Sequence, residues 1–109
     1  MNKRTISRWE KMRTDETRAV ERVLRQKFPN ADAYRYNSAS IRVRIIDPRF
    51  KGKSAEKRDA MIEPLIEQLP KSTQSDIMNL ITLSPDEVEN SLRASIANAE
   101  FEDPSPSKL

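Results

Sequence analysis

Apolar and polar residues alternate strictly in one stretch near the middle of the chain. There Ile41, Val43 and Ile45 are each separated by an arginine. A period of two is typical of a β-strand that packs one face against a core and leaves the other exposed. The pattern therefore predicts a strand over residues 40–46 whose outward face carries guanidinium groups.

A shorter strand is expected just before it, over residues 31–36. Alternation places Tyr34 and Tyr36 on one face and an arginine on the other, and the turn residues Asn37-Ser38 follow. Two such runs joined by a short turn predict an antiparallel hairpin. We expect the tyrosines to join the apolar residues in the core, and the outward face to carry three arginines, Arg35, Arg42 and Arg44.

Helical spacings of apolar residues predict a first helix over roughly 7–28, with Ser7 and Glu10 placed as a capping box. Its middle is ambiguous, because Thr14 could cap a second helix that follows a break. Such a break would leave Trp9 on a loose arm. Pro29 ends the element.

A second helix is predicted over roughly 54–69, because Ser54 is a good N-cap and apolar residues then recur at helical spacing. Pro64 lies inside it and removes one backbone hydrogen bond, so we expect a kink or two short helices that meet at Glu63. A polar linker over 71–75 follows. The run 77–83 is consistent with a third strand, although a short helix would also fit.

The clearest local signal starts at Ser84, which is a good helix N-cap. Pro85 follows at the first helical position, and Glu87 at the third position completes a capping box with Ser84. A helix is predicted from there to about residue 100. Val88, Leu92, Ile96 and Ala99 recur at helical spacing and continue it.

In order, these elements predict one α+β domain over residues 7–100, with a three-stranded sheet packed against about three helices in the order α-β-β-α-β-α. Residues 1–6 are expected to form a flexible N-terminus. Residues 101–109 contain two prolines and few packing side chains, so they are expected to form a disordered tail.

Composition narrows the possible functions. The 109 residues include no cysteine and no histidine, which excludes disulfides, thiolate or imidazole metal sites, and cysteine or histidine catalysis. No apolar run approaches the roughly 18 residues of a membrane span, and the N-terminal residues contain no hydrophobic segment. We expect a soluble cytoplasmic protein with no cofactor, no metal and no membrane association.

The sequence Gly52-Lys53-Ser54 matches the end of a phosphate-binding P-loop and lies between a predicted strand and a predicted helix. The motif also requires a glycine five positions before Gly52, where this chain has Asp47, and Gly52 is the only glycine present. The interpretation that fits is a turn glycine followed by a helix N-cap.

Basic residues are concentrated in and around the central strand, although the net charge of the whole chain is only +3. Such a cluster next to a helix N-terminus could hold the phosphate oxygens of RNA or DNA, and outward-facing tyrosines could stack bases. The alternative is a solvated sheet face with the tyrosines in the core. The candidate binding residues are Arg42, Arg44, Arg49, Lys51, Gly52, Lys53, Lys57 and Arg58.

No pair of carboxylates stands in an apolar setting that would raise a pKa for general acid catalysis, so we expect no enzymatic activity. The sequence supports a non-enzymatic binding module that binds RNA or DNA through its basic surface. The alternative is an adaptor that docks a protein through the same loop or through the Trp9 arm.

Residues 41–90 resemble the BolA-like family at several short motifs. The segment 49–54, RFKGKS, is similar to the family's Phe-x-Gly-x-Ser loop, and Ser84-Pro85-Asp86-Glu87 is similar to its Thr-Pro-Glu-Glu helix start. The resemblance implies a sheet similar to the type II KH arrangement, with a monothiol glutaredoxin partner around an iron–sulfur cluster or a DNA-binding role. The family's histidines fall on Asp59 and Asp76, so cluster ligation is not expected.

Overall fold

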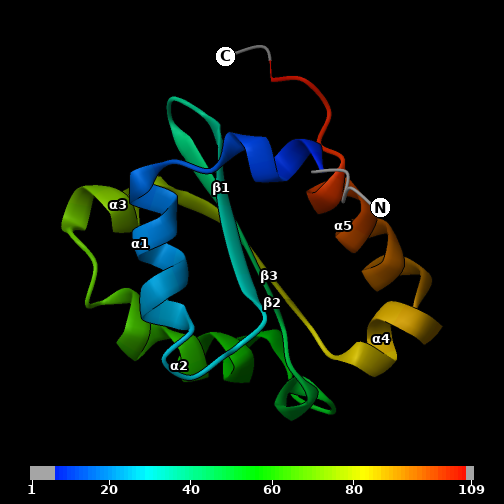
Figure 1. Ribbon diagram of the computed structural model, residues 1–109. Coiled ribbons are helices and arrows are strands. Elements are labelled where there is room, and N and C mark those ends of the chain that lie inside the picture. The colour runs from blue at the N-terminus through cyan, green and yellow to red at the C-terminus, as the bar shows by residue number, and fades with distance from the viewer. Residues whose placement is uncertain (1–6, 108–109) are drawn as a thin grey trace, which may run out of the picture.

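A computed structural model describes residues 7–107. The chain forms an α+β fold in which a three-stranded sheet lies between two helical layers (Figure 1). One layer contains the helices α1 (Asp15–Leu24), α2 (Ala55–Ile66) and α3 (Lys71–Asp76). The other contains the 3-10 helix η1 (Arg8–Met12) with α4 (Pro85–Asn90) and α5 (Leu92–Glu102).

The sheet contains the strands β1 (Ala31–Asn37), β2 (Ser40–Ile46) and β3 (Ile77–Leu83), in that order. The pair β1 and β2 is antiparallel, as a short hairpin requires, whereas β2 and β3 are parallel. A parallel pair needs a long crossover connection, which α2 and α3 supply. The predicted α+β class and all three predicted strands are confirmed.

The main core lies between the sheet and the α1–α2 layer. It combines the alternating residues Ile41, Val43 and Ile45 of β2 with Leu24 of α1 and Ile62 of α2, all of them fully buried. Since burying a side chain of this size contributes about 1.5–3 kcal/mol, this cluster is the main apolar contribution to the stability of the fold.

The predicted first helix is broken at Thr14, as the alternative interpretation allowed. The Thr14 side chain accepts a hydrogen bond from the Thr17 amide and caps α1, and η1 precedes it. Trp9 does not lie on a loose arm: only 4% of it is exposed, because it packs against Tyr34 and Phe101. That part of the expectation was wrong.

The second helix begins after Ser54, as predicted, and continues through Pro64 as one element. The polar stretch expected to be a linker instead forms α3, whose Thr73 is buried. The capping box between Ser84 and Glu87 is confirmed, but the helix it starts ends at Asn90, and Ser91 caps a separate helix, α5.

Helix α5 packs through Ala94 and Phe101, which are buried. Leu92 and Ile96 lie on its outer side and are 77% and 57% exposed. The predicted disordered tail starts too early, because α5 includes Phe101 and because Pro104 is fully buried. The expected flexible segment 1–6 lies outside the described residues, as do residues 108–109.

Among residues 7–107, no helix is both long enough and apolar enough to cross a membrane.

Candidate nucleic-acid interface

The hairpin register places the tyrosines and the β2 arginines on the same face of the sheet. Directly paired residues of an antiparallel ladder point to the same side, and here Tyr34 pairs with Arg42 while Arg35 pairs with Ile41. The expected common outward face of Arg35, Arg42 and Arg44 is therefore wrong. Ala33 pairs with Val43 on the side of the main core. Tyr34, the next residue of β1, therefore points to the opposite side, toward the layer that contains η1 and α5.

Arg44 is part of the interior. It is 5% exposed, and its guanidinium lies 2.7 Å from an Asp32 carboxylate oxygen and 2.8 Å from one of Glu102. The Phe101 ring packs 4.5 Å from it. The side chain therefore holds α5 against the sheet and presents no free charge to a ligand.

Arg42 is similarly occupied. Its guanidinium lies 3.8 Å from the Tyr36 ring centroid, and its side chain is 15% exposed. Burial raises the pKa of Tyr34, although a hydrogen bond from Arg42 acts in the opposite direction. Because Tyr34 is buried and Tyr36 is covered by Arg42, base stacking on this sheet face is not supported.

The loop after β2 is shaped by Asp47 and Gly52. Asp47 accepts hydrogen bonds from the amide and the guanidinium of Arg49 around the 3-10 helix η2 (Pro48–Phe50), and the side-chain bond lowers the pKa of Asp47. Gly52 has φ +75°, in the left-handed region that favours glycine. The loop conformation therefore depends on both residues.

Arg58 is also structural. It is 8% exposed and donates hydrogen bonds to the carbonyls of Lys53 and Thr82, while Glu87 lies 2.9 Å away. Burial opposes ionisation of Glu87, but the hydrogen bonds from Arg58 and Ser84 outweigh it, so the pKa of Glu87 lies below its usual value. Arg58 thus connects α2, β3 and α4.

Four predicted residues remain fully on the surface: Lys51, Gly52, Lys53 and Lys57. Arg49 is partly available, since 44% of its side chain is exposed beside Asp47. The predicted site is therefore reduced to the loop and the first turn of α2.

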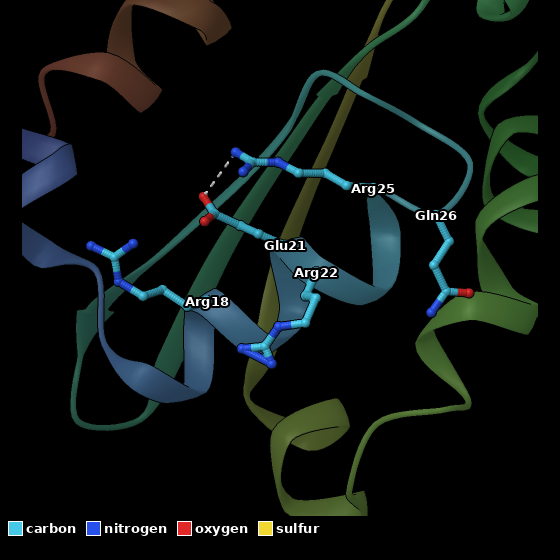
Figure 2. Close-up of a pocket in the computed structure, with 5 residues that line it drawn as sticks. All are labelled: Arg18, Glu21, Arg22, Arg25 and Gln26. Atoms are coloured by element: carbon cyan, nitrogen blue, oxygen red, sulfur yellow. Dashed lines mark ion pairs between the residues drawn. The ribbon is translucent and has the colours of Figure 1, made fainter.

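A second basic group, which the sequence-based predictions missed, lies on α1. Arg18, Arg22 and Arg25 recur at i, i+4 and i+7 and line an open cavity of about 490 Å³ (Figure 2). Arg25 pairs with the buried Glu21 at 3.6 Å, whereas Arg18 and Arg22 form no ion pair with any described residue. Their helical spacing was visible in the sequence and could have identified them.

The two basic groups adjoin. The Arg49 guanidinium donates to the Lys27 carbonyl across 2.6 Å and lies 4.6 Å from the Phe28 ring, so the loop rests on the residues that follow α1. Within residues 18–27 and 48–57, Glu56 is the one exposed carboxylate. We name the combined surface the basic strip; it consists of Arg18, Arg22, Arg25, Lys27, Arg49, Lys51, Lys53 and Lys57.

Within the described part of the chain, no group of three or more carboxylates could hold a metal ion. In comparisons with protein-family models, with curated proteins and with solved structures, nothing matches this chain.

Proposed function

We propose that this protein is a non-enzymatic module that binds the phosphate backbone of RNA or DNA through the basic strip. The supporting observation is that the strip gathers cations that are exposed and form no ion pair with any residue in the range 7–107. Such cations can contact phosphates, and so release the counterions condensed on the nucleic acid, without first breaking an ion pair within the protein. They are Arg18, Arg22, Lys27, Lys51, Lys53 and Lys57.

The proposed contacts are to phosphate and not to bases. Phe28 and Phe50, the aromatic residues nearest the strip, are fully buried and stack on each other with ring centroids 5.5 Å apart. Phosphate contacts position a protein on nucleic acid but carry no sequence information. We therefore expect weak sequence preference.

The BolA-like resemblance, and the KH-like arrangement it implies, remain a prediction. The mixed three-stranded sheet with helices is compatible with it. KH domains clamp nucleic acid with a GXXG loop, however, and Gly52 is the only glycine in this chain. The proposed mode of binding therefore uses side-chain cations in place of a glycine loop.

The test is a fluorescence-anisotropy titration of a labelled 20-nucleotide single-stranded RNA, and of a DNA duplex, at two or more salt concentrations. If six phosphates of a single strand are contacted, the logarithm of the binding constant should fall with the logarithm of salt with a slope of about −4. Binding that is absent, or that does not respond to salt, would refute the proposal.

A pair of charge-reversal variants localises the surface. The double variant Arg22→Glu, Lys51→Glu lies within the strip, and we expect it to weaken binding at least tenfold. The matched control Lys71→Glu, Arg93→Glu changes the net charge equally at exposed positions on α3 and α5. Equal losses in both variants would show that net charge, and not the strip, governs binding.

A further inference from the structure

Strand β3 forms an open edge of the sheet. Its inner side faces β2, where the Leu83 carbonyl accepts a hydrogen bond from the Asp47 amide. Because backbone groups alternate in direction along a strand, the amides and carbonyls of Leu80 and Thr82 point outward. Arg58 donates a hydrogen bond to the Thr82 carbonyl, whereas the outward amide and carbonyl of Leu80 form no hydrogen bond with any described residue.

An apolar groove runs beside this open edge. It has a volume of about 270 Å³, and its apolar lining comes from Ile62 and Ile66 on α2 and from Ile77 and Leu80 on β3. Leu80 pairs with Val43, which belongs to the main core, so its side chain points to the α2 side of the sheet. A strand added beside β3 would therefore direct every second side chain into the groove.

The charge around the groove restricts what can occupy it. Asp59 and Glu63 line the groove, and with Glu56 and with Glu67, the C-cap residue of α2, they form an exposed acidic row. None of the four forms an ion pair within the described part of the chain. A second copy added antiparallel at the same edge would bring two such rows together, and the repulsion between like charges disfavours that arrangement.

We propose that the β3 edge and its groove bind an extended segment of another protein by strand addition. The groove-facing side chains of that segment are apolar at the centre and are flanked by lysine or arginine, which face the α2 carboxylates. Backbone hydrogen bonds to Leu80 supply affinity, and the groove and its acidic row supply specificity. This surface is separate from the basic strip and opposite in charge, so the inference does not depend on the proposed function.

The probe is the capped synthetic peptide Lys-Thr-Ile-Thr-Ile-Thr-Lys. Its lysine and isoleucine side chains fall on one face of a strand, its threonines favour extended structure, and its palindromic sequence fits either strand direction. We expect binding by NMR titration, with the largest amide shifts at Leu80 and its neighbours and with slower hydrogen exchange of the Leu80 amide. An N-methylated version that cannot donate from its central amides should lose binding.

A charge exchange then tests the acidic row. Glu63→Lys should weaken binding of the lysine-ended peptide about fivefold, and a glutamate-ended peptide should bind this variant better than the native protein. The matched control Glu89→Lys, on α4, should change neither affinity. The proposal is overturned if the peptide does not bind at millimolar concentration, if N-methylation has no effect, if Glu63→Lys and Glu89→Lys behave alike, or if the edge is occupied by a second copy in solution.

Discussion

Tyr34 and Arg42 lie opposite each other on β1 and β2, and the Arg42 guanidinium donates a hydrogen bond to the Tyr34 hydroxyl across 3.3 Å. The same hydroxyl donates to the Phe101 carbonyl across 2.9 Å. The face of the sheet that alternation marks as polar is thus covered by α5 and η1 and forms a second core. Its arginines are structural, and the surface available for ligands lies elsewhere.

The substitution Phe101→Ala tests whether α5 is an integral part of the domain. The ring is fully buried between Trp9 and Tyr34, at centroid distances of 5.4 and 4.7 Å. We expect a loss of about 3–4 kcal/mol in the free energy of unfolding, measured by urea denaturation, because the variant loses apolar burial and leaves a cavity. In the control Leu92→Ala, an exposed side chain of the same helix is shortened, and we expect a change below about 0.5 kcal/mol. Similar losses in both variants would show that α5 does not pack as described.

The substitution Arg44→Met tests the ion pairs that the buried Arg44 forms with Asp32 and with the half-exposed Glu102. Removing one partner of a buried pair usually costs about 3–5 kcal/mol, but Asp32 keeps Arg13 and Arg25 within 3.4 Å, so we expect a loss of about 2 kcal/mol. The control Arg18→Met, at an exposed position, should change stability by less than about 0.5 kcal/mol. A methionine variant as stable as the native protein would mean that the ion pairs give no net stabilisation.

The features that depend only on neighbouring residues were predicted correctly from the sequence. The N-caps at Ser54 and Ser84 and the third strand depend on neighbouring residues, and all three are found. The face exposed by each strand does not follow from local pattern, because a one-residue change of register moves every side chain to the other side. The buried face of α5 does not follow from local pattern either, because the buried Phe101 and the exposed Ile96 are both apolar.

Parts of the candidate site were predictable for the same reason. Lys51, Lys53 and Lys57 lie in a loop and a first helical turn, where exposure is the usual outcome, and they are exposed. The burial of Arg44 depends on Glu102, which is 58 positions away in the chain, and no local pattern indicates that pairing. The contact of Arg49 with Lys27 is similarly long-range, so the connection between the two basic groups could be found only in the fold.

The substitution Gly52→Ala tests the conformation of the loop. A methyl group added at this position would meet no atom within 4 Å, so any cost comes from the left-handed backbone alone. We expect a loss of about 1 kcal/mol in the free energy of unfolding. Gly52→Asn should lose less, because asparagine tolerates this conformation better. If alanine were as stable as glycine, the loop would adopt another conformation.

The pH dependence of stability should report the Asp47–Arg49 contact. Hydrogen bonds from Arg49 hold the pKa of Asp47 below its usual value of 3.8 in the folded state. A carboxylate with a depressed pKa in the folded state stabilises the fold at pH values above its unfolded pKa, and this contribution is lost as the pH falls through the folded pKa.

Asp47→Asn should therefore destabilise the protein at pH 7, by about 1 kcal/mol because Arg49 is partly exposed to solvent. The difference from the native protein, measured by urea unfolding, should be constant between about pH 7 and 5. It should shrink below about pH 4, where the unfolded state begins to bind a proton at Asp47, and it is lost when the folded carboxylate is also protonated at lower pH. The control Glu89→Gln, at an exposed carboxylate on α4, should show no such change. A difference that persists unchanged to pH 2 would indicate that the carboxylate acts through its shape and neutral hydrogen bonds, and not through its charge.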